Sequence, residues 1–167
     1  MLDKRKFYIN GRWVEPKRPN DFNVINPCNE DPCAIISLGS KEDTNAAIES
    51  AKNAFETWKE TTKEDRLNYL EKLLSVYKKR SREMAEAISL EMGAPMDWAT
   101  EVQTASGQSH LEDFILRLKD FEFDEHFNKK SNNHIYYEPI GVCGLITPWN
   151  WPINQIALKV IPALATG

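Results

Sequence analysis

The spacing of the hydrophobic residues changes near Ser40, and the change separates two kinds of predicted structure. Before Ser40, short runs of aromatic and β-branched residues alternate with turn residues, as in "FYINGRWV" with Asn10-Gly11 at its centre. This pattern is typical of a β-hairpin, and the runs "FNVIN" and "CAIISLG" predict two further short strands. After Ser40 the hydrophobic residues recur at helical intervals, which predicts a series of helices.

Four helices are predicted up to about Lys119. The first begins at Ser40 and the second at Thr62, and each has an aspartate three residues later, as in a capping box. The third carries hydrophobic residues over 84–92 and ends at "GAP", where glycine and then proline stop a helix. The fourth runs from about Asp97 to about Lys119.

The last part of the chain is predicted to form a strand, a turn and a helix. The polar stretch "DFEFDEHFNKKSNN" is loop-like and leads into a short strand in "HIYYEP". The run "IGVCGLI" (residues 140–146) is almost wholly apolar, which suits a strand buried on both faces of a parallel sheet. The turn "TPWNWP" and an apolar helical pattern follow, with Pro152 in the first helical turn. Strand, turn and helix make half of a βαβ unit, so we expect an incomplete sheet and a chain taken from a larger protein.

The turn "TPWNWP" places one strong side-chain hydrogen-bonding group, Asn150, between two indoles and two prolines. In open α/β sheets, ligands bind at the carboxyl ends of the strands, which is where this turn is predicted to lie. The amide of Asn150 has two possible uses. It can cap the following helix, as asparagine often does, or it can donate a hydrogen bond to an oxyanion from a rigid position. The residues themselves leave both uses open.

Composition narrows the possible partners and the compartment. The net charge of −4 over 167 residues argues against a nucleic-acid partner. No apolar run is long enough to span a membrane, and the basic start lacks the apolar core of a secretory signal. The odd number of cysteines argues against a disulfide framework and predicts a reducing, cytoplasmic location. Cys143, inside the apolar run, is predicted to be a small core residue.

The segment "EPIGVCGLITPWNWPINQIALKVIPALATG" resembles the aldehyde dehydrogenase family, as do "FYINGRWV", "VINP", "LEMGAP" and "YYEPIGV" in the same order. The resemblance implies the N-terminal portion of an enzyme that oxidises an aldehyde to a carboxylic acid with NAD or NADP. In such enzymes a cysteine thiolate attacks the aldehyde and a glutamate activates water, and both would lie beyond Gly167. None of Cys28, Cys33 and Cys143 matches that nucleophile, and the chain contains no G-x-G-x-x-G.

The resemblance also implies roles for particular residues. Asn150 matches the side-chain donor to the oxyanion. The cofactor-lining segment corresponds to Ile146, Thr147, Pro148 and Trp149. The aldehyde channel corresponds to Trp151, Gln155 and Leu158, although core packing is the alternative for the last two. A monovalent cation site, which occurs in many members, corresponds to Val24, Ile25 and Glu91, although a solvated glutamate is the alternative for Glu91.

The fold class implied is α/β, as the beginning of a Rossmann-like cofactor-binding domain with several helices and a β-hairpin oligomerisation arm. Residues 1–121 and 139–167 would belong to the cofactor-binding domain, with the sheet incomplete. Residues 122–138 would be the arm that joins a sheet of a neighbouring subunit in a homodimer or homotetramer. Two other interpretations are a non-catalytic, shortened paralogue that acts as an interaction module and a free-standing nucleotide-binding domain.

Overall fold

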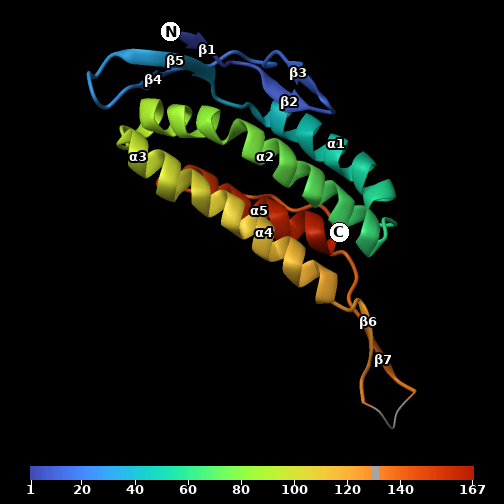
Figure 1. The fold of residues 1–167 in the computed structure, drawn as a ribbon. Helices are drawn as coiled ribbons and strands as arrows, with labels where there is room; N and C mark the ends of the chain where they lie inside the picture. The colour runs from blue at the N-terminus through green and yellow to red at the C-terminus, as the bar shows by residue number, and fades with distance from the viewer. Residues whose placement is uncertain (129–131) are drawn as a thin grey trace.

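Five short strands form one layer at the N-terminal end of the molecule (Figure 1) in a computed structural model that describes residues 1–128 and 132–167. Strands β1 (Leu2–Asp3), β4 (Asp21–Ile25) and β5 (Pro32–Ser37) make a sheet in the order β1-β5-β4, with β1 parallel and β4 antiparallel to β5. Strands β2 (Phe7–Ile9) and β3 (Arg12–Val14) make an antiparallel hairpin.

The predicted hairpin turn at Asn10-Gly11 is confirmed. Both residues have positive φ angles, 53° for Asn10 and 72° for Gly11, as a tight primed turn between twisted strands requires. Asparagine and glycine are the residues that adopt this conformation at least cost. The turn chemistry therefore sets the register of β2 and β3 without help from distant residues.

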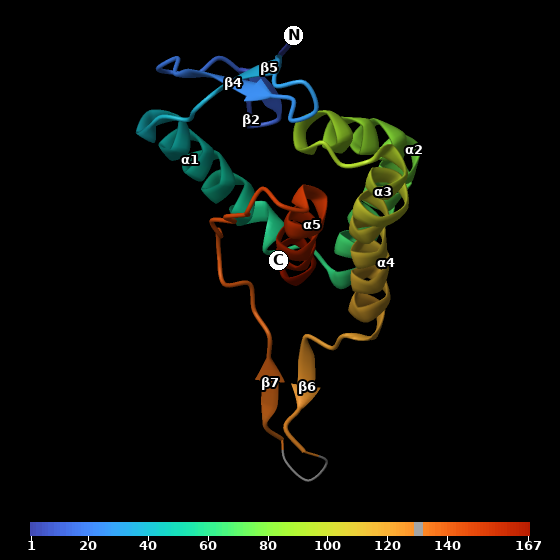
Figure 2. The ribbon, with the colours of Figure 1, turned by 90° about the vertical axis from the view of Figure 1, so that its left-hand side faces the viewer.

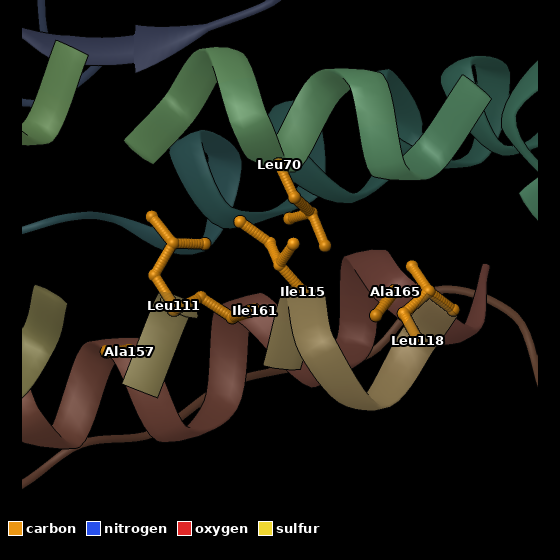
Figure 3. Packing of buried hydrophobic residues seen from close by; sticks show 7 residues of the cluster. All are labelled: Leu70, Leu111, Ile115, Leu118, Ala157, Ile161 and Ala165. Carbon is orange, nitrogen blue, oxygen red and sulfur yellow. The ribbon is translucent and has the colours of Figure 1, made fainter. Parts of the chain in front are cut away.

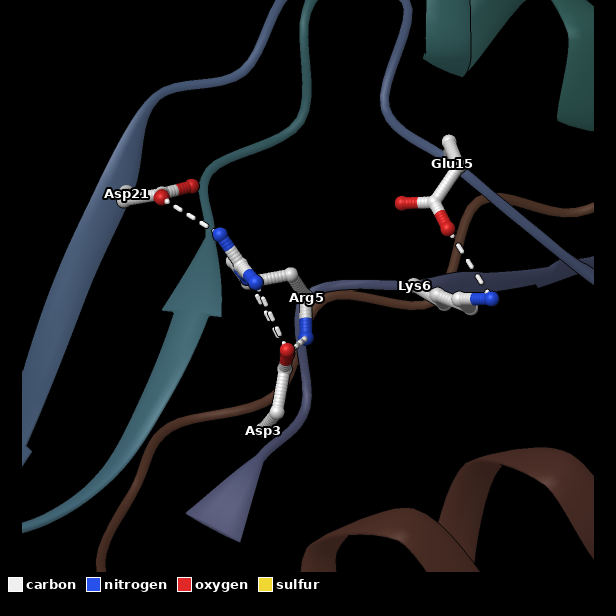
Figure 4. Close-up of polar contacts among 5 residues, drawn as sticks. All are labelled: Asp3, Arg5, Lys6, Glu15 and Asp21. Carbon is white, nitrogen blue, oxygen red and sulfur yellow. Dashed lines mark hydrogen bonds and ion pairs between the residues drawn. The ribbon is translucent and has the colours of Figure 1, made fainter. Parts of the chain in front are cut away.

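Ion pairs connect the strands of this layer (Figure 4). The Arg5 guanidinium lies 2.7 Å from Asp3 Oδ2 and 3.2 Å from Asp21 Oδ2, so it links the end of β1 to β4. Lys6 Nζ lies 2.9 Å from Glu15 Oε1 across the hairpin. The hydrogen bonds from Arg5 lower the pKa of Asp3 to about 2. These groups are exposed, so the pairs orient the strands more than they stabilise the fold.

The first two helices begin where the capping boxes predict. Helix α1 spans Lys41–Trp58 with Ser40 as its N-cap, and α2 spans Lys63–Met92 with Thr62 as its N-cap. In each case the hydroxyl accepts from the backbone N–H of an aspartate three residues later, while that aspartate accepts from the backbone N–H of the cap. The hydroxyls also donate to the carboxylates, which is the main cause of the lowered pKa of both aspartates.

The predicted second and third helices are wrong as separate elements, because α2 is one helix of 30 residues. The stretch "KKRSRE" interrupts the hydrophobic pattern but contains no glycine or proline to end a helix. Its charged residues pair along the helix surface instead, Arg80 with Glu83 and Arg82 with Glu86. The helix ends as predicted at Gly93, whose φ of 71° only glycine adopts easily.

The fourth predicted helix is confirmed, with an irregular start. Helix α3 (Met96–Trp98) leads into a π-helical segment, η1 (Ala99–Thr104), and then into α4 (Ala105–Asp120). A π-helical turn is wider than an α-helical turn and often marks a functional site. Helix α5 (Pro152–Thr166) packs beside α4 and α2, and Figure 2 shows the three helices below the strand layer.

The main core lies between α2, α4 and α5 (Figure 3). Its seven buried residues are aliphatic, and together they remove three helix faces from water, which is the main stabilising contribution. They are Leu70 from α2, Leu111, Ile115 and Leu118 from α4, and Ala157, Ile161 and Ala165 from α5. The two alanines of α5 in this core have small side chains, which let the helices approach closely.

Gly107 lies where α4 closely approaches α2 and α5. A Cβ added there would lie 2.5 Å from Tyr77 Oη and 2.9 Å from Ile153 Cγ1. We expect Gly107→Ala to lower the free energy of unfolding by about 1–3 kcal/mol, because the clash outweighs alanine's higher helix propensity. Urea unfolding measures this. The matched control is Gly144→Ala, where nothing lies within 4 Å, and an equal loss in both variants would contradict the prediction.

A second hairpin extends away from the helices at the end opposite the strand layer (Figures 1 and 2). It consists of β6 (Asp124–His126) and β7 (His134–Tyr136), paired antiparallel. The β6 segment belongs to a stretch predicted as loop, and it forms a strand because β7 supplies its backbone partner. Lys129 and Lys130, in the same polar stretch, lie outside the described residues.

The predicted buried strand over 140–146 is not formed, and this prediction is wrong for the chain as described. The segment is extended, but none of the sheets in residues 1–128 and 132–167 includes it. Ile140 is 94% exposed and Ile146 is 89% exposed. A strand forms when neighbouring strands satisfy its backbone N–H and C=O groups, and no described strand lies beside this one. The sheet is therefore incomplete, as the sequence predicts.

Candidate functional site

The candidate site is the turn over residues 147–151, which joins the extended segment to α5. Asn150 is exposed there, as are Thr147 and Pro148. Trp149 is 81% exposed and the preceding Ile146 is 89% exposed. The predicted cofactor-lining residues and the predicted oxyanion donor are therefore all exposed, in one continuous stretch of the chain.

The structure tests one of the two possible uses of Asn150, the capping of α5. Helix α5 begins at Pro152 and its N-cap is Trp151, with no side-chain hydrogen bond to the helix end. Asn150 is therefore not the helix cap, so the capping interpretation is wrong. Because its side chain is exposed, its amide N–H groups are accessible to a ligand.

Trp151 has an unusual backbone conformation that sets the direction of the turn. Its φ and ψ angles are 64° and 57°, in the left-handed region. Such a conformation costs about 1–2 kcal/mol for a residue with a bulky side chain, and it persists only where the surroundings hold it. Observed strain of this kind is common at functional sites.

The indole of Trp151 is held by Ser106, at the start of α4. Its Nε1–H donates to Ser106 Oγ at 3.1 Å, and Ser106 Oγ–H donates to the backbone carbonyl of Gln103 at 2.7 Å. Sequence reasoning missed Ser106, because a serine within a helical pattern carries no distinguishing signal. The contact joins residues 45 positions apart.

The π-helical segment beside Ser106 is fixed to α2. Tyr77 Oη donates to the backbone carbonyl of Thr104 at 2.7 Å, and burial raises the pKa of Tyr77 to about 12, so its hydroxyl stays protonated. The side-chain oxygens of Gln103 and Thr104 are buried, and neither has a hydrogen-bond partner in the described part of the chain. Unsatisfied buried polar atoms are costly and rare.

A second polar contact joins α4 to α5 one turn further along. His110 Nε2 lies 2.7 Å from Asn154 Oδ1. Of the predicted channel residues on α5, Gln155 is half-buried and Leu158 is 41% exposed. Leu158 belongs to neither buried cluster, so core packing within the described residues does not account for it.

The predicted cation ligands come from two elements that approach each other. Val24 and Ile25 are in β4, and Glu91 is exposed in the last turn of α2. The residues after β4 contact the end of α2, since a Cβ added at Gly93 would lie 2.7 Å from Pro27 Cγ. The carbonyl of Val24 already accepts a hydrogen bond from Cys33 Sγ at 3.4 Å. The described residues hold no cluster of three or more His, Cys, Asp and Glu side chains that could bind a metal.

The three cysteines are free thiols. Cys28 is exposed and Cys33 is half-buried. Cys143 is exposed, so its prediction as a core residue is wrong, for the same reason that the strand around it is not formed. It lines an apolar groove of about 470 Å³ between α1, residues 140–145 and α5.

Comparisons with known proteins give matches over most or all of the chain. A sequence model described as "Aldehyde dehydrogenase family" matches residues 13–167. A 3-succinoylsemialdehyde-pyridine dehydrogenase from Pseudomonas sp is 44% identical over 168 residues, which cover 100% of this chain and 35% of that protein. The chain thus spans about a third of the length of the curated relatives that it matches and corresponds to their N-terminal part.

Solved structures match over the same extent. A crystal structure of an aldehyde dehydrogenase from Bartonella henselae is 54% identical, with a TM-score of 0.97, and the match covers 99% of this chain and 35% of that one. Aldehyde dehydrogenase C from Pseudomonas syringae, in complex with NAD+ and octanal, is 38% identical, with a TM-score of 0.92 over 97% of this chain and 33% of that one. Among the described helices, none combines the length and the hydropathy that crossing a membrane requires.

Proposed function

Because the chain belongs to the aldehyde dehydrogenase family, we propose that it supplies the oxyanion donor and part of the cofactor site of an enzyme that oxidises an aldehyde to a carboxylic acid. NAD or NADP is the proposed cofactor, and the NAD+ bound in the Pseudomonas syringae structure supports NAD. The proposed substrate is a small aldehyde, in line with the octanal in the same structure.

The observation that carries the proposal is the position of Asn150. Its amide is exposed and is not used to cap α5. Pro148 and Pro152 restrict the backbone on either side, and Trp151 is held in a left-handed conformation. A donor held in place before charge develops stabilises a transition state without reorganisation, which is what an oxyanion site requires.

The exposed surface beside Asn150 suits a flat cofactor ring. Ile146 and Trp149 present apolar surface there, and the backbone of 146–148 is not paired in a strand. When bound, the nicotinamide of NAD or NADP supplies the hydride acceptor. Residues of this chain then bind and orient it, and Asn150 donates to the substrate oxygen. The family resemblance assigns the attack on the aldehyde to a cysteine that none of Cys28, Cys33 and Cys143 matches.

Trp151, Gln155 and Leu158 are proposed to face the aldehyde. Trp151 and Leu158, at the start of α5 and within it, are partly exposed. Gln155, which lies between them in the sequence, is half-buried. We also propose a monovalent cation at Val24, Ile25 and Glu91. Its support is that carbonyl and carboxylate oxygens are the ligands that hard cations prefer, and that the residues after β4 contact the end of α2.

The proposed assembly is a homodimer or homotetramer built through residues 122–138. An isolated two-stranded hairpin is marginally stable in water, and β6 and β7 extend away from the helices. Their exposed edges suit pairing with a strand of another subunit. Residues 1–121 and 139–167 are proposed to form the beginning of the cofactor-binding domain. The free cysteines are consistent with the proposed cytoplasmic location.

An activity assay on the full-length protein tests the proposal. We expect reduced cofactor to appear, by its absorbance, when the protein is mixed with NAD+ or NADP+ and an aldehyde such as octanal. The corresponding carboxylic acid, which is already oxidised, is the control and should give no signal. The 167-residue chain alone should also give none, because it lacks the attacking cysteine. A full-length protein that assembles but oxidises no aldehyde would favour the non-catalytic interaction module.

A further inference from the structure

We propose that Ser106 is a positioning residue for Asn150 and acts through the indole of Trp151. The inference rests on the proposed function, because it concerns the same oxyanion donor. It goes beyond that function because it rests on contacts between α4 and the turn at 147–151. Neither the resemblance nor the comparisons assign a role to these contacts.

The first step is that the backbone of Trp151 sets the direction of Asn150. The two residues share a peptide bond, and the φ and ψ angles of Trp151, 64° and 57°, fix how the turn enters α5. In an ordinary right-handed or extended conformation, Trp151 would redirect the preceding peptide and its neighbour's side chain. Whatever holds Trp151 in the left-handed region therefore holds the Asn150 amide.

The second step is that two hydrogen bonds hold Trp151. Its backbone carbonyl accepts from the N–H of Gln155 at 3.2 Å, which is an ordinary bond of the first helical turn. Its indole N–H donates to Ser106 Oγ at 3.1 Å. Of these two bonds, the second reaches a residue outside the turn and its helix. It therefore connects the strained residue to the rest of the fold.

The third step is that Ser106 itself is oriented. Its hydroxyl has one proton, which it donates to the carbonyl of Gln103 at 2.7 Å. An oxygen lone pair is then left for the indole N–H. The Gln103 carbonyl belongs to the π-helical segment, and the next residue, Thr104, is fixed to α2 through Tyr77. The connection thus runs from the packed helices to the turn.

Irregular backbone geometry on both sides of the Ser106–Trp151 contact favours a functional role for this contact over simple packing. The π-helical segment and the left-handed Trp151 are each unfavourable locally, and they meet at Ser106. The buried oxygens of Gln103 and Thr104 without described partners add to the cost. Strain that is retained in this way is characteristic of sites where a side chain must be held in place.

Kinetics of the full-length enzyme test the proposal. We expect Ser106→Ala to lower kcat for the aldehyde by about 10-fold, because loss of the hydroxyl lets the donor move, while KM for the cofactor stays within about 2-fold. Ser106→Thr keeps a hydroxyl and should recover most of the rate. The matched control is Ser109→Ala, at an exposed serine of the same helix, which should leave kcat unchanged.

A double-mutant cycle separates positioning from general stability. In an Asn150→Ala background, Ser106→Ala should change kcat by less than about 2-fold, since there is no longer a donor to position. A full 10-fold loss in that background would overturn the proposal, as would an unchanged kcat in the single variant. Failure of Ser106→Thr to recover activity in a folded protein would count against the hydroxyl as well.

A crystal structure of the Ser106→Ala protein tests the geometry independently of activity. We expect Trp151 to leave the left-handed region and Asn150 to move from its wild-type position. An unchanged turn would overturn the positioning role. If the wild-type protein oxidises no aldehyde, the proposed function fails, and this structural comparison still decides whether Ser106 holds the turn.

Discussion

Replacing Asn150 with alanine in the full-length enzyme is expected to lower kcat by about 10²–10³-fold, the loss typical of removing one oxyanion donor. The physical reason is that the exposed amide donates to an oxygen that is more negative in the transition state than in the aldehyde. KM for the cofactor should change little, because the variant retains the cofactor-lining residues. Steady-state kinetics with saturating aldehyde and varied NAD+ measure both quantities.

The control for this substitution is another asparagine of similar exposure. Asn53, in α1, is exposed and lies outside the turn, so Asn53→Ala should retain the wild-type kcat. Equal kcat values for the Asn150 variant and the wild type would remove the oxyanion role. A variant that keeps kcat but melts at a lower temperature would show that Asn150 supports the fold instead.

Replacing Leu111 with alanine is expected to lower the free energy of unfolding by about 3–5 kcal/mol. Leu111 is 1% exposed and lies in the core between α2, α4 and α5 (Figure 3). Truncation loses the transfer free energy of the side chain and leaves a cavity that rigid helices cannot close. Urea unfolding of the purified protein measures the effect. The dependence of the unfolding free energy on urea concentration (the denaturant slope) is compared between variants.

Leu116 provides the matched control on the same helix. It is 61% exposed, so Leu116→Ala makes the same chemical change without opening a cavity, and its effect should stay within about 0.5 kcal/mol. Similar losses in the two variants would mean that the helices do not pack as described. A change in the denaturant slope for Leu111→Ala alone would indicate a change in the compactness of the denatured or native state, or loss of two-state unfolding.

The sequence by itself determined the features that depend on neighbouring residues. The tight turn at Asn10-Gly11, the caps at Ser40 and Thr62 and the helix end at Gly93 are all where the pattern predicts them. Each depends on side-chain hydrogen bonds or backbone freedom within about four residues. Such interactions form in the same way whatever lies elsewhere in the fold.

Hydrophobicity alone was a weaker guide. It predicted a buried strand over 140–146 and a core role for Cys143, and both are exposed in the described chain. An apolar run predicts that a segment is buried, but it does not predict which element covers it. A strand also needs partner strands for its backbone hydrogen bonds. The charged stretch inside α2 led to the wrong prediction of two separate helices. A helix can continue through a turn that has no apolar residue.

Only the tertiary structure decided how the candidate site is held. The contact from Trp151 to Ser106, the bond from Tyr77 to Thr104 and the close approach at Gly107 each join residues far apart in the sequence. They depend on how three helices pack, and no local pattern of residue types encodes that geometry. The family resemblance read from the sequence therefore predicted Asn150 as a donor, and the packing of α2, α4 and α5 supplies the contacts that we propose hold it in position.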